Sequence, residues 1–291
     1  MIPTRLPSAL KAFELRSYDP QHNMTLPLGT EILMQLYHNP MSTCSQKVRL
    51  VLAEKSLDFD SIILDLQQGE QFKPYYLALN PLAVVPTLVD DHQAMIESTL
   101  INVYLEERYP GPALTPSTAV ERHQVRLFMK VIDDVLHPAC GNITYAIGIR
   151  PGLLRRSKAD ITTLINAIPD PLRRRDRAQV IAKGVEAENF DAALTAYLTV
   201  LDQAEARLNG QPYLTGSSVS LADFALLPYL IRLDHLALYD GIEARPLLSV
   251  WYNRMRDRPS YHDAITAWVS TAAIGAFRAA GEQVKDQLKL G

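Results

Sequence analysis

The fold is decided by one stretch near the N-terminus, Tyr37-His38-Asn39-Pro40-Met41-Ser42-Thr43-Cys44-Ser45-Gln46-Lys47-Val48-Arg49. A β-type run at residues 32–37 leads into it, and Asn39–Pro40 predicts a turn. A helix is predicted over residues 42–55, because apolar residues spaced i, i+4, i+7 and i+8 share one of its faces: Cys44, Val48, Val51 and Leu52. A strand, a turn and a helix in this order are typical of an α/β domain.

The same alternation continues to residue 110. The patterns predict a strand at residues 59–64, a short helix at 70–78, a hairpin of 86–89 with 94–96, and a helix from about Ser98. This last helix is expected to stop at Tyr109-Pro110-Gly111-Pro112, where prolines and a glycine break the pattern. The order β-α-β-α-β-β-α predicts a compact mixed domain over residues 31–110.

The rest of the chain is helical in pattern. Residues 111–118, rich in Pro, Ser and Thr, are predicted to be a linker to a helical domain over residues 119–291. Pro138 and Gly141 interrupt its first helical stretch, which is therefore either one long helix or a kinked pair. Further helices are predicted over residues 189–208, 220–233, 245–256 and 260–272, with a polar, basic insertion over residues 150–188 and an irregular lead over residues 1–30.

Composition excludes several classes of protein. The chain has 291 residues, 47 % of them apolar, which suggests a soluble protein of two domains. Its net charge of −3 leaves no basic surplus for nucleic acid. Two cysteines are too few for a disulfide framework, and the seven histidines show no metal-ligand spacing, so no metal is expected. No apolar run approaches the roughly 18 residues of a membrane span and no signal peptide is visible, so we expect a cytoplasmic protein.

The start of the helix at residue 42 is suited to binding an anion. Unpaired backbone N–H groups and the helix dipole favour negative charge there, and a cysteine in this position has its pKa lowered from about 8.5. The hydroxyls of Ser42 and Ser45 provide donors for a thiolate brought by a ligand. In the alternative interpretation, Thr43 and Gln46 form a capping box and Cys44 is a small buried apolar residue.

Two other helix starts are either binding sites or helix caps. Glu97-Ser98 ends a strand and opens a helix, which makes it a potential carboxylate site, although Ser98 is also a suitable N-cap. Ser220-Leu221-Ala222-Asp223 has the spacing of a capping box, so Ser220 and Asp223 are predicted to be structural rather than a catalytic pair.

Taken together, these segments resemble the glutathione transferase family over roughly residues 31–270. The matching elements are the stretch of residues 37–49, Leu79-Asn80-Pro81, Val85-Pro86-Thr87-Leu88, Glu97-Ser98, Tyr104-Leu105-Glu106 and Ser220-Leu221-Ala222-Asp223. The resemblance implies a thioredoxin-like α/β N-terminal domain and an all-helical C-terminal domain, paired in a homodimer. It also implies a cis peptide bond between Val85 and Pro86.

The resemblance assigns binding roles to five residues. The backbone of Val85, beside Pro86, would pair with the cysteinyl part of glutathione, Glu97 and Ser98 would hold its γ-glutamyl end, and Gln71 would contact the tripeptide. Glutathione is thus the expected co-substrate.

Three side chains are alternatives for the catalytic position. In serine-type classes the first serine of a Ser-x-Cys-Ser run donates to the glutathione sulfur, which corresponds to Ser42. In relatives such as reductive dehalogenases the cysteine of the run forms a mixed disulfide, which corresponds to Cys44. Ser45 is the third, if the register of the match slips.

The resemblance implies a transferase whose glutathione thiolate attacks a small hydrophobic, aromatic electrophile and displaces a leaving group. Ether cleavage is one form of this displacement, because insertions similar to that of residues 150–188 occur in bacterial transferases that cleave β-aryl ethers. The alternatives are a Cys44-dependent thiol reductase or reductive dehalogenase, and a glutathione-binding scaffold without turnover. The scaffold is suggested by a likeness to ganglioside-induced differentiation proteins.

Two groups of residues are left over. The basic residues of the insertion are predicted to form a solvated helical face, with an acidic partner or substrate carboxylates as the alternative: Arg155, Arg156, Lys158, Arg173, Arg174, Arg175 and Arg177. Core packing is expected for most of a second group, for which an electrophile pocket is the alternative: Met129, His137, Cys140 and Tyr145.

Overall fold

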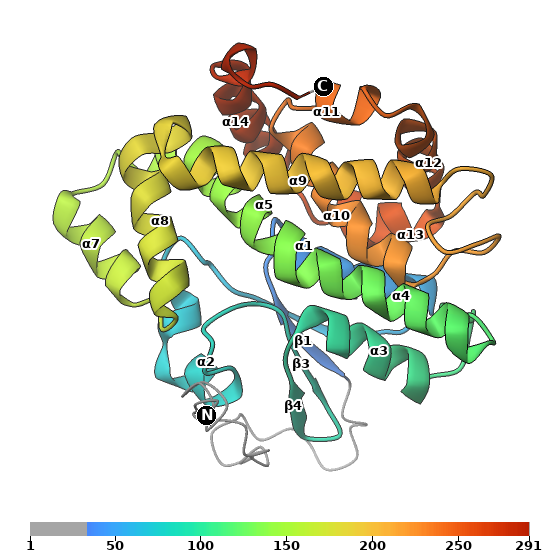
Figure 1. Cartoon of the computed structure of the whole chain (residues 1–291). Helices are drawn as coiled ribbons and strands as arrows, with labels where there is room; N and C mark the ends of the chain where they lie inside the picture. The colour runs from blue at the N-terminus through green and yellow to red at the C-terminus, as the bar shows by residue number, and fades with distance from the viewer. Residues whose placement is uncertain (1–33, 291) are drawn as a thin grey trace, which may run out of the picture.

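The computed structural model describes residues 34–290 and shows a small sheet domain joined to a larger helical one (Figure 1). Strands and helices of the sheet domain follow the predicted order. Its elements are β1 (Gln35–His38), α1 (Thr43–Glu54), β2 (Asp60–Ile63), a 3-10 turn at Glu70–Phe72, α2 (Pro74–Leu79), β3 (Thr87–Asp90), β4 (Gln93–Met95) and α3 (Ser98–Arg108). The irregular lead predicted for residues 1–30 lies outside the described residues.

The four strands pair in the order β2-β1-β3-β4. In β1, Leu36 lies opposite Ser61 of the parallel strand β2 and opposite Leu88 of the antiparallel strand β3. A parallel pair needs a crossover, and α1 supplies it between β1 and β2. This confirms the thioredoxin-like α/β domain.

The remainder is all-helical, which confirms the second half of the predicted fold class. Its helices are α4 (Ala119–Val131), α5 (His137–Thr144), α6 (Arg150–Leu153), α7 (Lys158–Asn166), α8 (Pro171–Lys183), α9 (Glu188–Arg207), α10 (Leu221–His235), α11 (Asp240–Glu243), α12 (Pro246–Arg256), α13 (Pro259–Tyr261) and α14 (Thr271–Glu282). Within residues 34–290, none of the helices combines the length and the apolar character that crossing a membrane requires.

The long helical stretch at the start of this domain is not broken by Pro138. α4 passes through a π-helical segment, Ile132–Leu136, into α5, and a second π-helical segment, Tyr145–Ile149, leads on to α6. Pro138 lies in the first turn of α5, directly after the first π-helical segment, where a missing N–H is tolerated. Segments of π-helix often mark functional sites, and His137 is the residue that follows this one.

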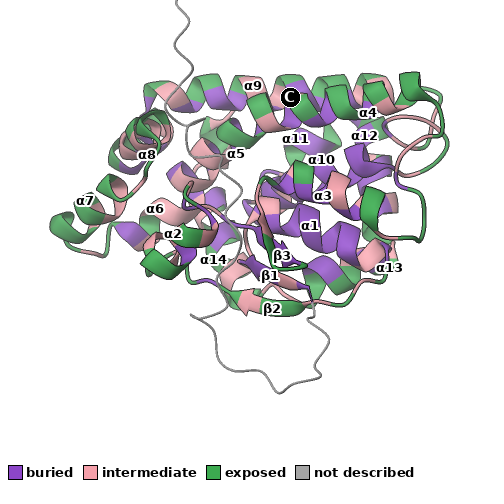
Figure 2. Cartoon of the chain, turned by 90° about the horizontal axis from the view of Figure 1, so that it is seen from below, coloured by how far each residue is buried: buried purple, intermediate pink, exposed green. Residues whose placement is uncertain are grey.

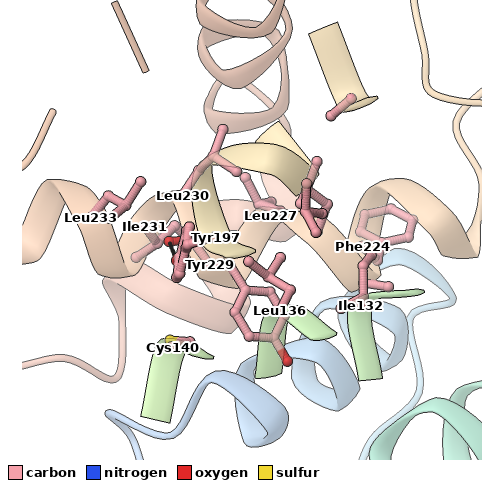
Figure 3. Close-up of a cluster of buried hydrophobic side chains, with 14 of the residues drawn as sticks. Ile132, Leu136, Cys140, Tyr197, Phe224, Leu227, Tyr229, Leu230, Ile231 and Leu233 are labelled. Atoms are coloured by element: carbon pink, nitrogen blue, oxygen red, sulfur yellow. Dashed lines mark hydrogen bonds between the residues drawn. The ribbon is translucent and has the colours of Figure 1, made fainter. Parts of the chain in front are cut away.

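The core is centred on α10, which is buried along nearly its whole length (Figure 2). Apolar side chains of α10, among them Phe224 and Leu227, pack there against α9 and the long helix (Figure 3). Tyr197 comes from α9, and the long helix contributes Ile132, Leu136 and Cys140. α10 also packs against α1, so the two domains share one core. Met129 and Cys140 belong to this core, as predicted.

The insertion forms α7 and α8, which lie together at one side of the molecule (Figure 1). It contacts the sheet domain through two arginines. Arg156 donates to the carbonyl of Gln67 at 2.9 Å, and Arg173 donates to the carbonyl of Leu82, also at 2.9 Å. The insertion therefore reaches the loops that border β2 and β3.

One helix prediction was wrong. The stretch of residues 260–272 is not a single helix, because the chain leaves the helical conformation after Thr266 and α14 starts afresh at Thr271. Ser270 explains the restart, since its hydroxyl accepts the N–H of Ala273 at 3.0 Å as the N-cap of α14.

Candidate active site

Ser42 is the N-cap of α1. Its hydroxyl oxygen accepts the N–H of Ser45 at 3.2 Å, and among residues 34–290 its own hydroxyl proton has no acceptor. The alternative interpretation, a capping box between Thr43 and Gln46, is wrong, because Ser42 occupies the cap position and the Gln46 amide donates to the carbonyl of Pro40 instead. Ser42 thus stabilises the helix with a lone pair and keeps a proton to donate.

Cys44 lies in the first turn of α1 and faces His137 at the start of α5. The Cys44 Sγ is 3.5 Å from Nδ1 and 3.9 Å from Nε2 of this imidazole. The hydroxyl of Tyr229 from α10 is 3.2 Å from the same Nδ1 and orients the ring. A thiol and an imidazole at this separation can share a proton, which is the arrangement that activates a nucleophilic cysteine.

The surroundings of Cys44 favour its thiolate. Burial opposes ionisation, but the charge of His137, its hydrogen bond, the charge of Lys47 and a hydrogen bond from Ser98 together lower the pKa to about 7. The thiolate in turn raises the pKa of His137. Lys47 is held in place by Asp133, whose carboxylate is 2.7 Å from its ammonium group. The thiolate, which is the nucleophilic form of cysteine, is therefore more accessible at neutral pH than in a free cysteine.

Replacing His137 by alanine is expected to raise the pKa of the Cys44 thiol from about 7 toward the roughly 8.5 of free cysteine, because the main cause of the lowering is lost. Alkylation of the Cys44 peptide by iodoacetamide, followed against pH by mass spectrometry, measures this midpoint. His123→Ala, an exposed histidine on α4, is the matched control and should leave it unchanged. A midpoint that stays at pH 7 without His137 would contradict the assigned pairing.

The second helix start lies against the first. Glu97 is the N-cap of α3 with a φ of 68°, and Ser98 is the first helical residue, so Ser98 is not the N-cap. Ser98 is buried and contributes to lowering the pKa of Cys44, and Lys47 of α1 donates to the hydroxyl of Thr99 of α3 at 3.4 Å, so the starts of α1 and α3 lie close together. Two helix N-termini that meet at one point form a strongly anion-favouring position.

Val85 and Pro86 stand at the entrance to β3, and the peptide bond between them is cis, as the family resemblance implied. The preceding carbonyl, that of Val84, is fixed by hydrogen bonds from the Tyr76 hydroxyl and the Asn80 amide. Within residues 34–290 no hydrogen bond uses the backbone N–H or C=O of Val85. Both groups are therefore free to pair with a bound peptide.

Two of the predicted site residues, Ser45 and Gln71, do not lie where the starts of α1 and α3 come together. Ser45 is fully buried and its hydroxyl accepts the N–H of Asn39 at 3.3 Å, so it braces the turn before α1. Gln71 lies in the 3-10 turn after β2, donates to the carbonyl of Leu66 at 3.4 Å, and leaves its Oε1 buried without a partner. Its contact with a ligand remains a prediction.

Sequence reasoning missed the pairing of His137 with Cys44, because the two residues are 93 positions apart and the imidazole was one of several polar groups on a long helix. The prediction of a solvated arginine face was also wrong for Arg173 and Arg177. Both turn inward from α8, and burial lowers their pKa values. Within residues 34–290, no group of three or more His, Cys, Asp or Glu side chains has the arrangement of a metal site.

Comparisons with known proteins match both domains. Residues 36–113 match the family model described as glutathione S-transferase, N-terminal domain, and residues 187–254 match that of glutathione S-transferase, C-terminal domain. Glutathione S-transferase 3 of Zea mays is 30 % identical over 238 residues, which cover 80 % of this chain and 94 % of that protein. Tetrachloro-p-hydroquinone reductive dehalogenase of Sphingobium chlorophenolicum is 29 % identical over 248 residues, 79 % of this chain and 95 % of that protein.

A solved structure is also similar to this chain over both domains. The β-etherase LigF from Sphingobium sp. strain SYK-6 aligns with a TM-score of 0.74 at 25 % identity, over 81 % of this chain and 100 % of that one. The two family models leave residues 114–186 between them, and these residues include α7 and α8. The likeness thus covers both domains and nearly the whole length of these relatives, and the chain belongs to the glutathione S-transferase family.

Proposed function

We propose that this protein is a glutathione transferase that holds glutathione as its thiolate and directs the sulfur at a hydrophobic, aromatic electrophile. The observation that carries the proposal is that the starts of α1 and α3 lie close together, where Lys47 donates to the hydroxyl of Thr99 at 3.4 Å and Ser98 contributes to lowering the pKa of Cys44. Because helix N-termini stabilise anions, this point suits both the thiolate and the γ-glutamyl carboxylate of glutathione.

Ser42 is proposed to act on the sulfur. Its hydroxyl proton has no acceptor among residues 34–290 and can donate to a thiolate at the first turn of α1. The glutathione thiol loses its proton, the thiolate attacks the electrophilic carbon, and the leaving group departs with the electrons of the broken bond, which leaves a thioether.

The remaining contacts follow from the free groups around this point. We assign the backbone of Val85, beside Pro86, to the cysteinyl part of glutathione, since its N–H and C=O have no partner within residues 34–290. Glu97 and Ser98 are assigned to the γ-glutamyl end, and the unpartnered Oε1 of Gln71 to the tripeptide backbone.

The names of two relatives support our proposal for the substrate class. One is named a β-etherase and another a tetrachloro-p-hydroquinone reductive dehalogenase. An etherase breaks an ether bond and a hydroquinone is an aromatic ring, so we propose an aromatic electrophile, with an ether oxygen as one type of leaving group.

The test combines binding with turnover. We expect calorimetry to detect glutathione binding, and mass spectrometry to detect an S-arylated glutathione product from 1-chloro-2,4-dinitrobenzene or from a β-aryl ether. Binding without a product from either electrophile would favour a non-catalytic glutathione-binding scaffold. If neither binding nor product is found, the proposal is rejected.

A second candidate function is supported by the Cys44–His137 pair. A cysteine whose pKa is about 7 can attack the sulfur of a glutathionyl substrate as its thiolate. The bond between that sulfur and the substrate breaks, the departing group takes the electron pair and is thereby reduced, and Cys44 is left in a mixed disulfide with glutathione, as a thiol reductase or reductive dehalogenase requires. Incubation with oxidised glutathione tests it, because this function predicts a glutathione adduct on Cys44 that appears with a midpoint near pH 7.

We further propose that the protein is a cytoplasmic homodimer. Its two cysteines are unpaired, which suits a reducing compartment. Apolar side chains are exposed on the adjoining helices α3 and α4, where Leu100 is 64 % exposed and Val120 is 73 % exposed, and such a surface suits a subunit interface. Light scattering in solution tests the dimer.

A further inference from the structure

Arg177 of α8 is half-buried, and part of its guanidinium has no hydrogen-bond partner within the described residues. Its guanidinium lies 3.9 Å from the ring centroid of Tyr145, and its Nη1 is buried without a hydrogen-bond partner. The neighbouring acid, Asp176, pairs with Arg175 at 3.0 Å instead. Within residues 34–290 no carboxylate forms an ion pair with Arg177. A desolvated arginine without a counter-ion is costly unless an anion joins it.

The position of Arg177 relates it to the reacting sulfur. His137, Gly141 and Tyr145 follow one another at intervals of four residues, so they share one side of the long helix. Cys44 contacts His137 at one end of this row, and Arg177 lies against Gly141 and Tyr145 farther along. Four residues advance about 6 Å along a helix, which is the scale of one aromatic ring. An aromatic substrate at the sulfur can therefore extend toward Arg177.

Gly141 makes this approach possible. A Cβ built on Gly141 would lie 2.6 Å from the Arg177 Nη2, so any larger residue would push the guanidinium aside. α8 packs against α5 at this point, on the side of the molecule where the insertion lies (Figure 1).

Arg173 adds a second positive charge one helical turn away. Its Nη2 donates to the carbonyl of Leu82 at 2.9 Å, three residues before Val85. Burial lowers the pKa of Arg173, and the charges of Asp170, Tyr145 and Glu97 oppose this effect. Like Arg177, Arg173 makes no ion pair within residues 34–290. The two arginines line the side of α8 that faces the glutathione-binding loops and α5.

We propose that the insertion makes this enzyme selective for anionic electrophiles: Arg177, supported by Arg173, binds a carboxylate or phenolate oxygen on the aromatic substrate. This inference rests on the proposed function. The arginine fork suits an oxygen pair, and the Tyr145 ring beneath it restricts its orientation. The carboxylates of glutathione are the other source of such an anion. We favour the electrophile because Arg177 contacts the long helix of the helical domain, whereas the groups assigned to glutathione belong to the sheet domain.

The test measures binding without turnover. Calorimetry compares S-(4-carboxybenzyl)glutathione with S-benzylglutathione, which differ only in the carboxylate, and with glutathione alone. We expect the wild type to bind the carboxylated conjugate at least about tenfold more tightly, as a charge-assisted hydrogen-bond pair provides. Arg177→Met should lose most of this preference and keep its affinity for S-benzylglutathione within about twofold. Arg175→Met, two positions away and paired with Asp176 at the surface, is the matched control and should keep the preference.

Gly141→Ala provides a second variant, which displaces the guanidinium without removing its charge and should also reduce the preference. Thermal unfolding checks that each variant is folded. No preference in the wild type, or a preference that survives in Arg177→Met, overturns the inference. Equal weakening of glutathione and both conjugates in Arg177→Met also overturns it, because the arginine would then serve glutathione. Failure of the wild type to bind all three ligands would instead reject the proposed function.

Discussion

Replacing Ser42 by alanine is expected to lower kcat for conjugation of 1-chloro-2,4-dinitrobenzene about 100-fold, the usual effect of losing one donor to a developing or stabilised anion. The dissociation constant of glutathione should change by no more than about twofold, because the assigned binding groups, Val85 and Ser98, remain in place. The Ser42 oxygen caps α1, and its proton has no acceptor among residues 34–290, so a single side chain can stabilise both the helix and the thiolate.

Controls separate these two roles. Loss of the N-cap costs about 1 kcal/mol of stability, so assays are run well below the unfolding temperature. Ser42→Thr keeps a hydroxyl and a cap and should restore most of the turnover. Ser45→Ala, one turn away, removes a buried hydroxyl that only braces the turn before α1, and should keep kcat within a few-fold.

The same assay applied to Cys44→Ser decides between the two candidate functions. A transferase that relies on Ser42 should keep its turnover in Cys44→Ser and lose only the adduct with oxidised glutathione. Turnover that disappears in Cys44→Ser and survives in Ser42→Ala would reject the role of Ser42 and select the thiol reductase.

The sheet domain could be predicted because its signals are local. The apolar spacing of α1, the turn at Asn39–Pro40 and the hairpin around Asp91 each lie within a few residues, and the structure places strands and helices close to the predicted positions. The break before α14 was missed, because an apolar run that continues through Ala267 hides the cap at Ser270.

The site was predictable only in part, because some of its residues come together from distant parts of the sequence. Ser42, Cys44 and Ser98 lie at helix starts, and a helix start is a local feature with known chemistry. His137 becomes important only when α5 packs against α1, and no pattern within its own helix distinguishes it from other polar residues.

The surroundings of the arginines of α8 also depend on contacts that are distant in sequence. A helix so rich in basic residues has the pattern of a surface element, and periodicity gives no reason to bury Arg177. Its guanidinium lies against Gly141 of another helix, at a point where a side chain on that residue would displace it. The residues that are least predictable from the sequence are therefore those of the insertion, where the family models also find no match.

The predicted capping box at the start of α10 also has a larger role than its spacing indicated. Besides the Ser220 N–H at 2.8 Å and hydroxyl at 2.9 Å, the fully buried Asp223 accepts the N–H of Leu214 at 3.0 Å and the indole N–H of Trp251 at 2.8 Å. One carboxylate thus joins the loop before α10 and the helix α12 to the most buried helix of the protein.

Asp223→Ala is consequently expected to destabilise the protein by about 4 kcal/mol, since it leaves four donors around a buried gap, and to lower Tm by about 10 °C. Asp191→Ala, an exposed acid in the first turn of α9, is the matched control and should change Tm by little.

Burial raises the pKa of Asp223 despite its donors. A group whose pKa is raised by folding stabilises the folded state most below its unfolded pKa of about 4 and loses that contribution as the pH rises. The Tm advantage of the wild type over Asp223→Asn should therefore shrink from pH 4 upward, and an advantage that grows with pH would show that the four donors, rather than burial, dominate this carboxyl.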